Sequence, residues 1–65
     1  MNFLLKALIK KLEGQIEMAK ANILVYTRNP AGIGEHSDIV EAVEVEIAKI
    51  AEAEDKISAI KNHFE

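Results

Sequence analysis

The feature that most constrains this chain is a seven-residue apolar repeat that runs through two stretches and stops at a break between them. This spacing places side chains along one stripe of a helix and is typical of helices that pack together as in a coiled coil. In the first stretch the repeat comprises Leu5, Ile9, Leu12, Ile16, Ala19, Ile23 and Tyr26.

The second stretch carries the same repeat with one exception. Its members are Ile39, Val43, Glu46, Ile50, Ala53, Ile57, Ile60 and Phe64. Glu46 is the only charged member, and the adjacent Ile47 could supply apolar surface in its place. A buried polar residue in such a seam can fix register and oligomeric state. We therefore expect a structural role for Glu46, with Asn22 near it across the hairpin.

The break between the stretches, residues 28–36, holds the only proline and two of the three glycines. Pro30 disfavours helical geometry at the residue before it, and Gly32 and Gly34 permit backbone angles that other residues avoid. Asp38, followed three residues later by Glu41, fits an N-terminal capping box. The pattern predicts a helix over about 3–27, a loop over about 28–37 and a helix over about 38–63.

A short loop makes the two helices antiparallel neighbours, so the predicted fold is all-α, a single coiled-coil-like helical-hairpin domain. Phe3 and Phe64 are expected to close its open end. Only the layer at Ala19, where Glu46 and Ile47 compete, does not pair apolar with apolar. The predicted layers are Tyr26 with Ile39, Ile23 with Val43, Ile16 with Ile50, Leu12 with Ala53, Ile9 with Ile57 and Leu5 with Ile60.

A hairpin of this length is predicted to need a partner. The chain has 65 residues and no cysteine, and small domains without a disulfide usually rely on a metal or on another subunit. Apolar residues also remain outside the seam, namely Leu4, Leu8, Met18, Leu24, Val25, Val40, Val45 and Ile47. We expect self-association into a dimer or a higher even oligomer that forms a helical bundle. The predicted interaction stripe is Leu4, Leu8, Val40 and Ile47.

The loop is the one candidate region for ligand chemistry. Gly32 and Gly34 precede a helix start, where backbone amides can bind anions, but the third glycine of a dinucleotide motif is absent. His36 lies between Glu35 and Ser37, with Asp38 nearby, yet neither helix carries a His-x-x-x-His or Glu-x-x-His pair. An inter-helix turn explains Gly32, Gly34 and His36 more simply. The sequence predicts no catalytic residue, no cofactor and no metal site.

The distribution of charge supports the hairpin and argues against nucleic acid as a partner. Residues 1–30 carry five basic and two acidic side chains, a net of +3, and residues 31–65 carry three basic and nine acidic, a net of −6. The helices should therefore attract each other. The overall charge of −3 with few aromatic residues does not favour nucleic-acid binding. The basic amphipathic start continues the seam, and no membrane span is expected.

The stretch Asn29-Pro-Ala-Gly-Ile-Gly-Glu-His-Ser-Asp-Ile-Val-Glu-Ala resembles small uncharacterised proteins of marine tailed bacteriophages, as do Glu17-Met-Ala-Lys-Ala-Asn and the run Ile47–Lys56. The resemblance extends from about Glu17 to Phe64. It implies a phage or environmental origin and a helical hairpin in the host cytoplasm, but no activity.

Two functions are compatible with this sequence. The first is a non-enzymatic interaction or structural protein, a phage accessory factor that binds itself, with a host or phage protein as a further partner. The alternative is a small-molecule binder that holds a nucleotide or metabolite between subunits near the loop. An enzyme is not expected, because the sequence has neither an evident pocket nor a nucleophile paired with a base.

Overall fold

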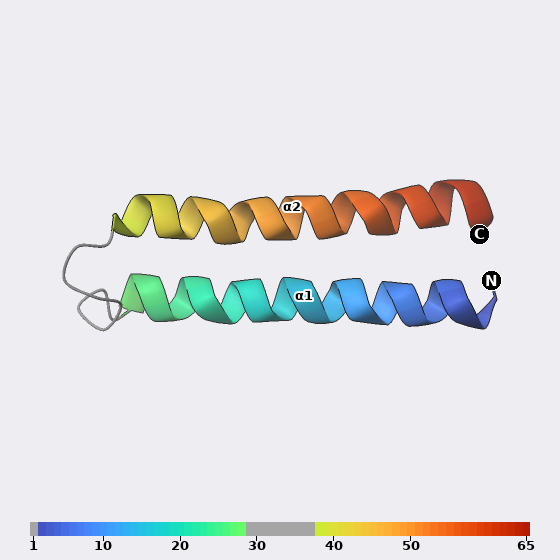
Figure 1. Cartoon of the computed structure of the whole chain (residues 1–65), viewed down its shortest axis with the longest axis horizontal. Helices are drawn as coiled ribbons and strands as arrows, with labels where there is room; N and C mark the ends of the chain where they lie inside the picture. Colours follow the sequence, from blue (N-terminus) through green and yellow to red (C-terminus); the bar gives the residue numbers. More distant parts are fainter. Residues whose placement is uncertain (1, 29–37) are drawn as a thin grey trace.

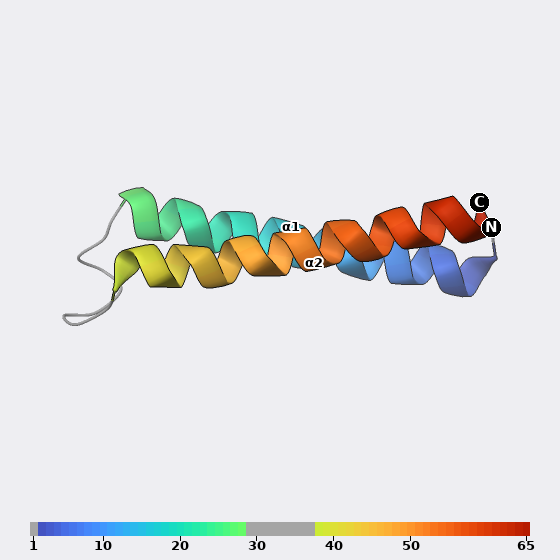
Figure 2. The same ribbon diagram turned by 90° about the horizontal axis from the view of Figure 1, so that it is seen from above.

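The apolar repeat folds as two helices of 26 residues each, α1 (Phe3–Arg28) and α2 (Ile39–Phe64). The computed structural model describes residues 2–28 and 38–65 of the chain. The helices run antiparallel and pack against each other. They lie side by side in Figure 1, and Figure 2 shows α2 crossing in front of α1. The structure measures 46 × 15 × 14 Å. The predicted all-helical hairpin is confirmed.

The helix boundaries differ from the predicted ones by one residue. Arg28 is still helical, because Pro30 restricts the residue directly before it and Arg28 lies one position earlier. Asp38 is not part of α2 but caps it, with φ −73° and ψ 101°. Residues 29–37, which contain the predicted loop candidates Gly32, Gly34 and His36, lie outside the described residues.

Both helices begin with a side-chain cap. The Glu41 amide donates to Asp38 Oδ1 at 3.0 Å. This is one of the two hydrogen bonds that make up the predicted capping box. At the start of α1 the Leu5 amide donates to Asn2 Oδ1 at 2.9 Å. The sequence analysis did not single out Asn2, although asparagine ranks among the best N-cap residues.

The seam lies where the repeat predicted. Leu12, Ala53 and Ile60 form the buried centre of the core, and partly buried aliphatic residues from both helices pack against it. These are Leu5, Ile9, Ile16 and Ile57. Ala19 is also buried, one heptad further along α1 than Leu12. The cluster occupies the half of the hairpin that carries the chain ends (Figure 1).

The structure decides which of Glu46 and Ile47 is buried in the seam, and it shows that the prediction for Phe3 and Phe64 was wrong. Glu46 is only 5% exposed whereas Ile47 is 51% exposed, so Glu46 occupies the interior position at the Ala19 layer. The rings of Phe3 and Phe64 are 77% and 63% exposed, so they do not close the open end. Both residues sit at the helix termini, where no further layer of the hairpin lies beyond them to cover a ring. The Phe64 ring instead stands edge-on to His63, with ring centroids 6.4 Å apart.

Candidate functional site

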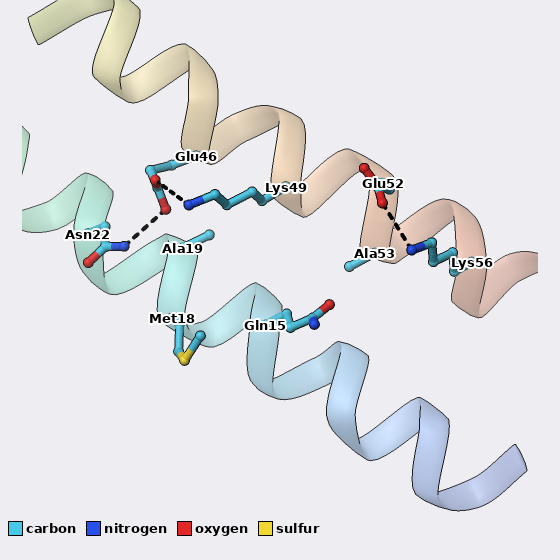
Figure 3. Close-up of a pocket in the computed structure, with 9 residues that line it drawn as sticks. All are labelled: Gln15, Met18, Ala19, Asn22, Glu46, Lys49, Glu52, Ala53 and Lys56. Atoms are coloured by element: carbon cyan, nitrogen blue, oxygen red, sulfur yellow. Dashed lines mark hydrogen bonds and ion pairs between the residues drawn. The ribbon is translucent and has the colours of Figure 1, made fainter. Parts of the chain in front are cut away.

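The buried carboxylate of Glu46 is held by one residue from each helix (Figure 3). Asn22 Nδ2, on α1, donates to Glu46 Oε1 at 3.0 Å. Lys49 Nζ, one turn further along α2, pairs with Glu46 Oε2 at 2.9 Å. Each carboxylate oxygen therefore has a partner, which satisfies the main condition for placing an ionised group in a seam.

These contacts stabilise the ionised form of Glu46. The hydrogen bond from Asn22 lowers the pKa of the Glu46 carboxyl below its ordinary value, and the hydrogen bond from Lys49 lowers it further. Burial acts in the opposite direction but does not outweigh them. Glu46 is thus a carboxylate at neutral pH, fixed in the seam rather than poised to exchange a proton.

An open groove of about 370 Å³ lies beside this polar pair, near the middle of the hairpin (Figure 3). Its floor includes the buried residues Ala19 and Ala53, whose methyl side chains leave space between the two helices. Longer polar side chains surround the floor. The full lining is Gln15, Met18, Ala19, Asn22, Glu46, Lys49, Glu52, Ala53 and Lys56.

The charges that line the groove neutralise one another. Lys49 pairs with Glu46 and Lys56 pairs with Glu52, each at 2.9 Å. Two cations and two anions leave no net charge to attract an ionic ligand. Across residues 2–28 and 38–65, no group of three or more His, Cys, Asp or Glu residues is placed to hold a metal ion.

The four residues of the predicted interaction stripe are all exposed, but they do not form one stripe. Leu4 and Leu8 lie near the start of α1, and Val40 and Ile47 near the start of α2. Because the helices are antiparallel, these pairs lie at opposite ends of the hairpin (Figure 1).

The two pairs also face different flanks of the hairpin. Ile47 lies about 100° around α2 from Glu46, whereas Lys49 lies about 60° from Glu46 in the other direction. Lys49 lines the groove, so Ile47 faces the opposite flank. Leu8 is seven residues before the groove residue Gln15 and therefore shares the groove flank.

Sequence reasoning found part of this site. It placed Glu46 in the seam with Asn22 across from it, and the hydrogen bond between them confirms this. It missed the ion pair with Lys49, although the three-residue spacing of Glu46 and Lys49 on a helix was a usable signal. It did not predict the groove, which depends on two alanines being brought to one place by the fold.

Within the described residues, neither helix has an apolar stretch of the length and hydropathy that crossing a membrane requires. Comparison with protein-family models, with curated proteins and with solved structures finds no match to the chain. The fold and the site define an antiparallel two-helix hairpin with a polar pair in its seam. Its function is therefore inferred from its own residues.

Proposed function

We propose that the chain is a non-catalytic interaction protein that works as a self-assembled helical bundle. The supporting observation is the imbalance between its core and its surface. Among the described residues only four apolar side chains are buried, Leu12, Ala19, Ala53 and Ile60. Ten large apolar side chains are exposed, namely Phe3, Leu4, Leu8, Met18, Leu24, Val25, Val40, Val45, Ile47 and Phe64.

The accessible surface supports the same proposal. The chain exposes 4948 Å², whereas a compact monomer of 7.2 kDa would expose about 4,100 Å². The excess is about 800 Å², which is roughly the area that one partner contributes to a standard protein interface. Covering that area with a second copy would give each chain the surface of a compact domain.

The resemblance to small phage proteins supplies a setting for this proposal. In that setting the assembled bundle is an accessory factor in the host cytoplasm, and its remaining exposed surface is available to a host or phage protein. No step of this function requires a reacting group or a cofactor.

Light scattering after size exclusion, over a range of protein concentrations, tests the proposal. We expect a mass that is an even multiple of 7.2 kDa and a melting temperature that rises with protein concentration, because association stabilises only the folded chain. A folded species of single-chain mass, with a melting temperature independent of concentration, would contradict self-assembly.

The groove supports a second candidate, the binding of a small uncharged polar molecule. Its volume of about 370 Å³ falls within the usual range for ligand pockets. The groove lies at the Ala19 layer in the middle of the hairpin, away from the loop end where the sequence analysis placed a ligand. A thermal-shift screen of small uncharged polar metabolites tests this candidate, and no stabilisation by any compound would count against it.

A further inference from the structure

Basic residues gather at the end of the hairpin where α1 begins and α2 ends (Figure 1). We refer to residues 2–11 and 56–65 as the basic tip. With His63 neutral, its charged side chains are five lysines and one acid, Glu65, a net of +4. The five lysines are all exposed, and they are Lys6, Lys10, Lys11, Lys56 and Lys61.

The rest of the described hairpin has the opposite charge. Residues 12–28 and 38–55 carry three basic and nine acidic side chains, a net of −6. The structure is 46 Å long, whereas the Debye length is about 8–10 Å at physiological ionic strength. An anionic surface that meets the basic tip end-on is therefore attracted by the tip, and most of its repulsion by the acidic part is screened.

The same end of the hairpin exposes large apolar side chains. Phe3 and Leu4 in the first turn of α1, and Phe64 at the end of α2, are all largely exposed. Lys6 and Lys61 each lie three residues from a phenylalanine, about 4.5 Å along the helix. Apolar and aromatic side chains with cations directly behind them suit the interface of an anionic bilayer, which offers acyl chains beneath negative headgroups.

The remaining charges around the tip are compatible with this contact. The other three lysines lie about 10–12 Å from the phenylalanines along the helices, whereas the nearest acids inward of the tip, Glu13 and Asp55, lie about 13–15 Å away. Two lysines also form exposed ion pairs, Lys10 with Glu13 at 3.4 Å and Lys56 with Glu52 at 2.9 Å. Exposed pairs of this kind are weak, so these ammonium groups stay available to a headgroup.

We propose that the basic tip docks end-on against a membrane surface that contains anionic lipid. Phe3, Leu4 and Phe64 enter the boundary between headgroups and acyl chains, and the lysines of the tip contact the anionic headgroups. A nucleic-acid duplex suits this end less well, because its phosphate backbone offers no apolar phase for the three side chains. The proposal goes beyond the proposed function and does not depend on it, since a single hairpin contains the whole tip.

Vesicle sedimentation tests the attraction. The full chain is mixed with vesicles of phosphatidylcholine alone, or with about one third phosphatidylserine, at physiological salt. We expect binding to the anionic vesicles to be at least about tenfold stronger, and to weaken as salt is added. Equal binding to both kinds of vesicle, or binding to neither, would overturn the proposal. So would binding to a DNA duplex, at the same phosphate concentration, that is as tight as binding to the anionic vesicles.

Charge reversal tests whether the tip makes the contact. Lys6→Glu and Lys20→Glu are a matched pair, because both residues are exposed and lie fourteen residues apart on the same side of α1. Lys6→Glu changes the charge by two units close to the membrane and should weaken binding to anionic vesicles at least about tenfold. Lys20→Glu makes the same change beyond the Debye length and should leave binding within about twofold. An equal loss in both variants would overturn docking through the tip.

Tryptophan fluorescence tests insertion of the apolar end with all native charges kept, because the chain has no tryptophan. Phe3→Trp places a reporter at the tip and Val40→Trp places one at the opposite end, at positions that are 77% and 79% exposed. Anionic vesicles should shift the Phe3→Trp emission to shorter wavelength and leave the Val40→Trp emission unchanged. No shift in Phe3→Trp, or an equal shift in both variants, would overturn the proposal.

The outcomes also separate this proposal from self-assembly. A folded monomer that binds anionic vesicles through its tip would contradict the self-assembled bundle and support tip docking. An even oligomer that leaves the vesicles unbound would support the bundle and overturn tip docking.

Discussion

Gly14 occupies a helical position on α1 with open space where a side chain would be. A Cβ added there would have no neighbouring atom within 4 Å. Glycine inside a helix costs about 0.5–1 kcal/mol relative to alanine. We therefore expect Gly14→Ala to raise the free energy of unfolding by about that amount, measured by urea denaturation at a fixed protein concentration.

Ala21 gives a matched control for Gly14, because it is exposed and lies seven residues further along the same side of α1. Ala21→Gly should lower stability by a similar amount, about 0.5–1 kcal/mol. If Gly14→Ala destabilised the protein instead, a neighbouring chain would have to occupy the space next to Gly14.

Glu46 makes the stability of the hairpin depend on pH. Its pKa is lowered in the folded state, mainly by the Asn22 hydrogen bond. A lowered carboxyl pKa contributes stability that is fully present above the unfolded value of about 4.3 and is lost as the pH falls through the lower folded value. We expect the free energy of unfolding of the native chain to fall more steeply below about pH 5 than that of Glu46→Gln.

Asn22→Ala provides the complementary measurement. It removes the largest cause of the lowered pKa, so the pKa of Glu46 should rise when followed by carbon-detected NMR through a pH titration. An unchanged Glu46 titration in Asn22→Ala would show that the contact does not set the ionisation of this group.

At the scale of the helix, the start of α2 depends on one side chain. Asp38 accepts the Glu41 amide hydrogen bond and is exposed, so its substitution changes the cap without opening the core. We expect Asp38→Ala to lower the free energy of unfolding by about 1 kcal/mol, with Asp38→Asn close to the native value. Equal losses in both variants would show that the carboxylate charge, and not the hydrogen bond, stabilises this helix end.

The helices and their seam could be predicted because they depend on spacing alone. The heptad pattern placed Leu12, Ala53 and Ile60 in the interior, and they are buried. The heptad pattern also placed Glu46 in the seam, but hydropathy favoured the adjacent Ile47, so the sequence left these two residues in competition at the Ala19 layer.

Other features depend on geometry that a one-dimensional pattern does not contain. The exposure of Phe3 and Phe64 follows from where both helices stop. The groove follows from two alanines, Ala19 and Ala53, that lie far apart in the chain and close together in the fold. The charged residues that line the groove are visible in the sequence, but their pairing into two ion pairs is seen only in the structure.

For the whole molecule, we expect the polar pair of Asn22 and Glu46 in the seam to select one oligomeric state. Replacing Asn22 and Glu46 together with leucine removes the polar pair without leaving either partner unsatisfied. We expect the double variant to unfold at a higher denaturant concentration but to show a mixture of masses by light scattering, because a uniformly apolar seam tolerates several registers. A single mass identical to that of the native chain would contradict this role.

Glu46→Leu alone is the control for the double variant. It leaves Asn22 without its carboxylate partner, and it should therefore gain less stability than the double variant. Comparison of the two separates the loss of the pair from the gain in apolar area.

The position of the buried cluster also determines how the chain folds. Leu12, Ala53 and Ile60, with Leu5, Ile9 and Ile57 around them, join parts of the chain near its two ends. Bringing such distant segments together costs more chain entropy than joining residues near the break between the helices. A partly formed hairpin that grew outward from that break would gain little burial before it reached these layers. The chain is therefore expected to fold in one cooperative step whose barrier is crossed only when its two ends meet.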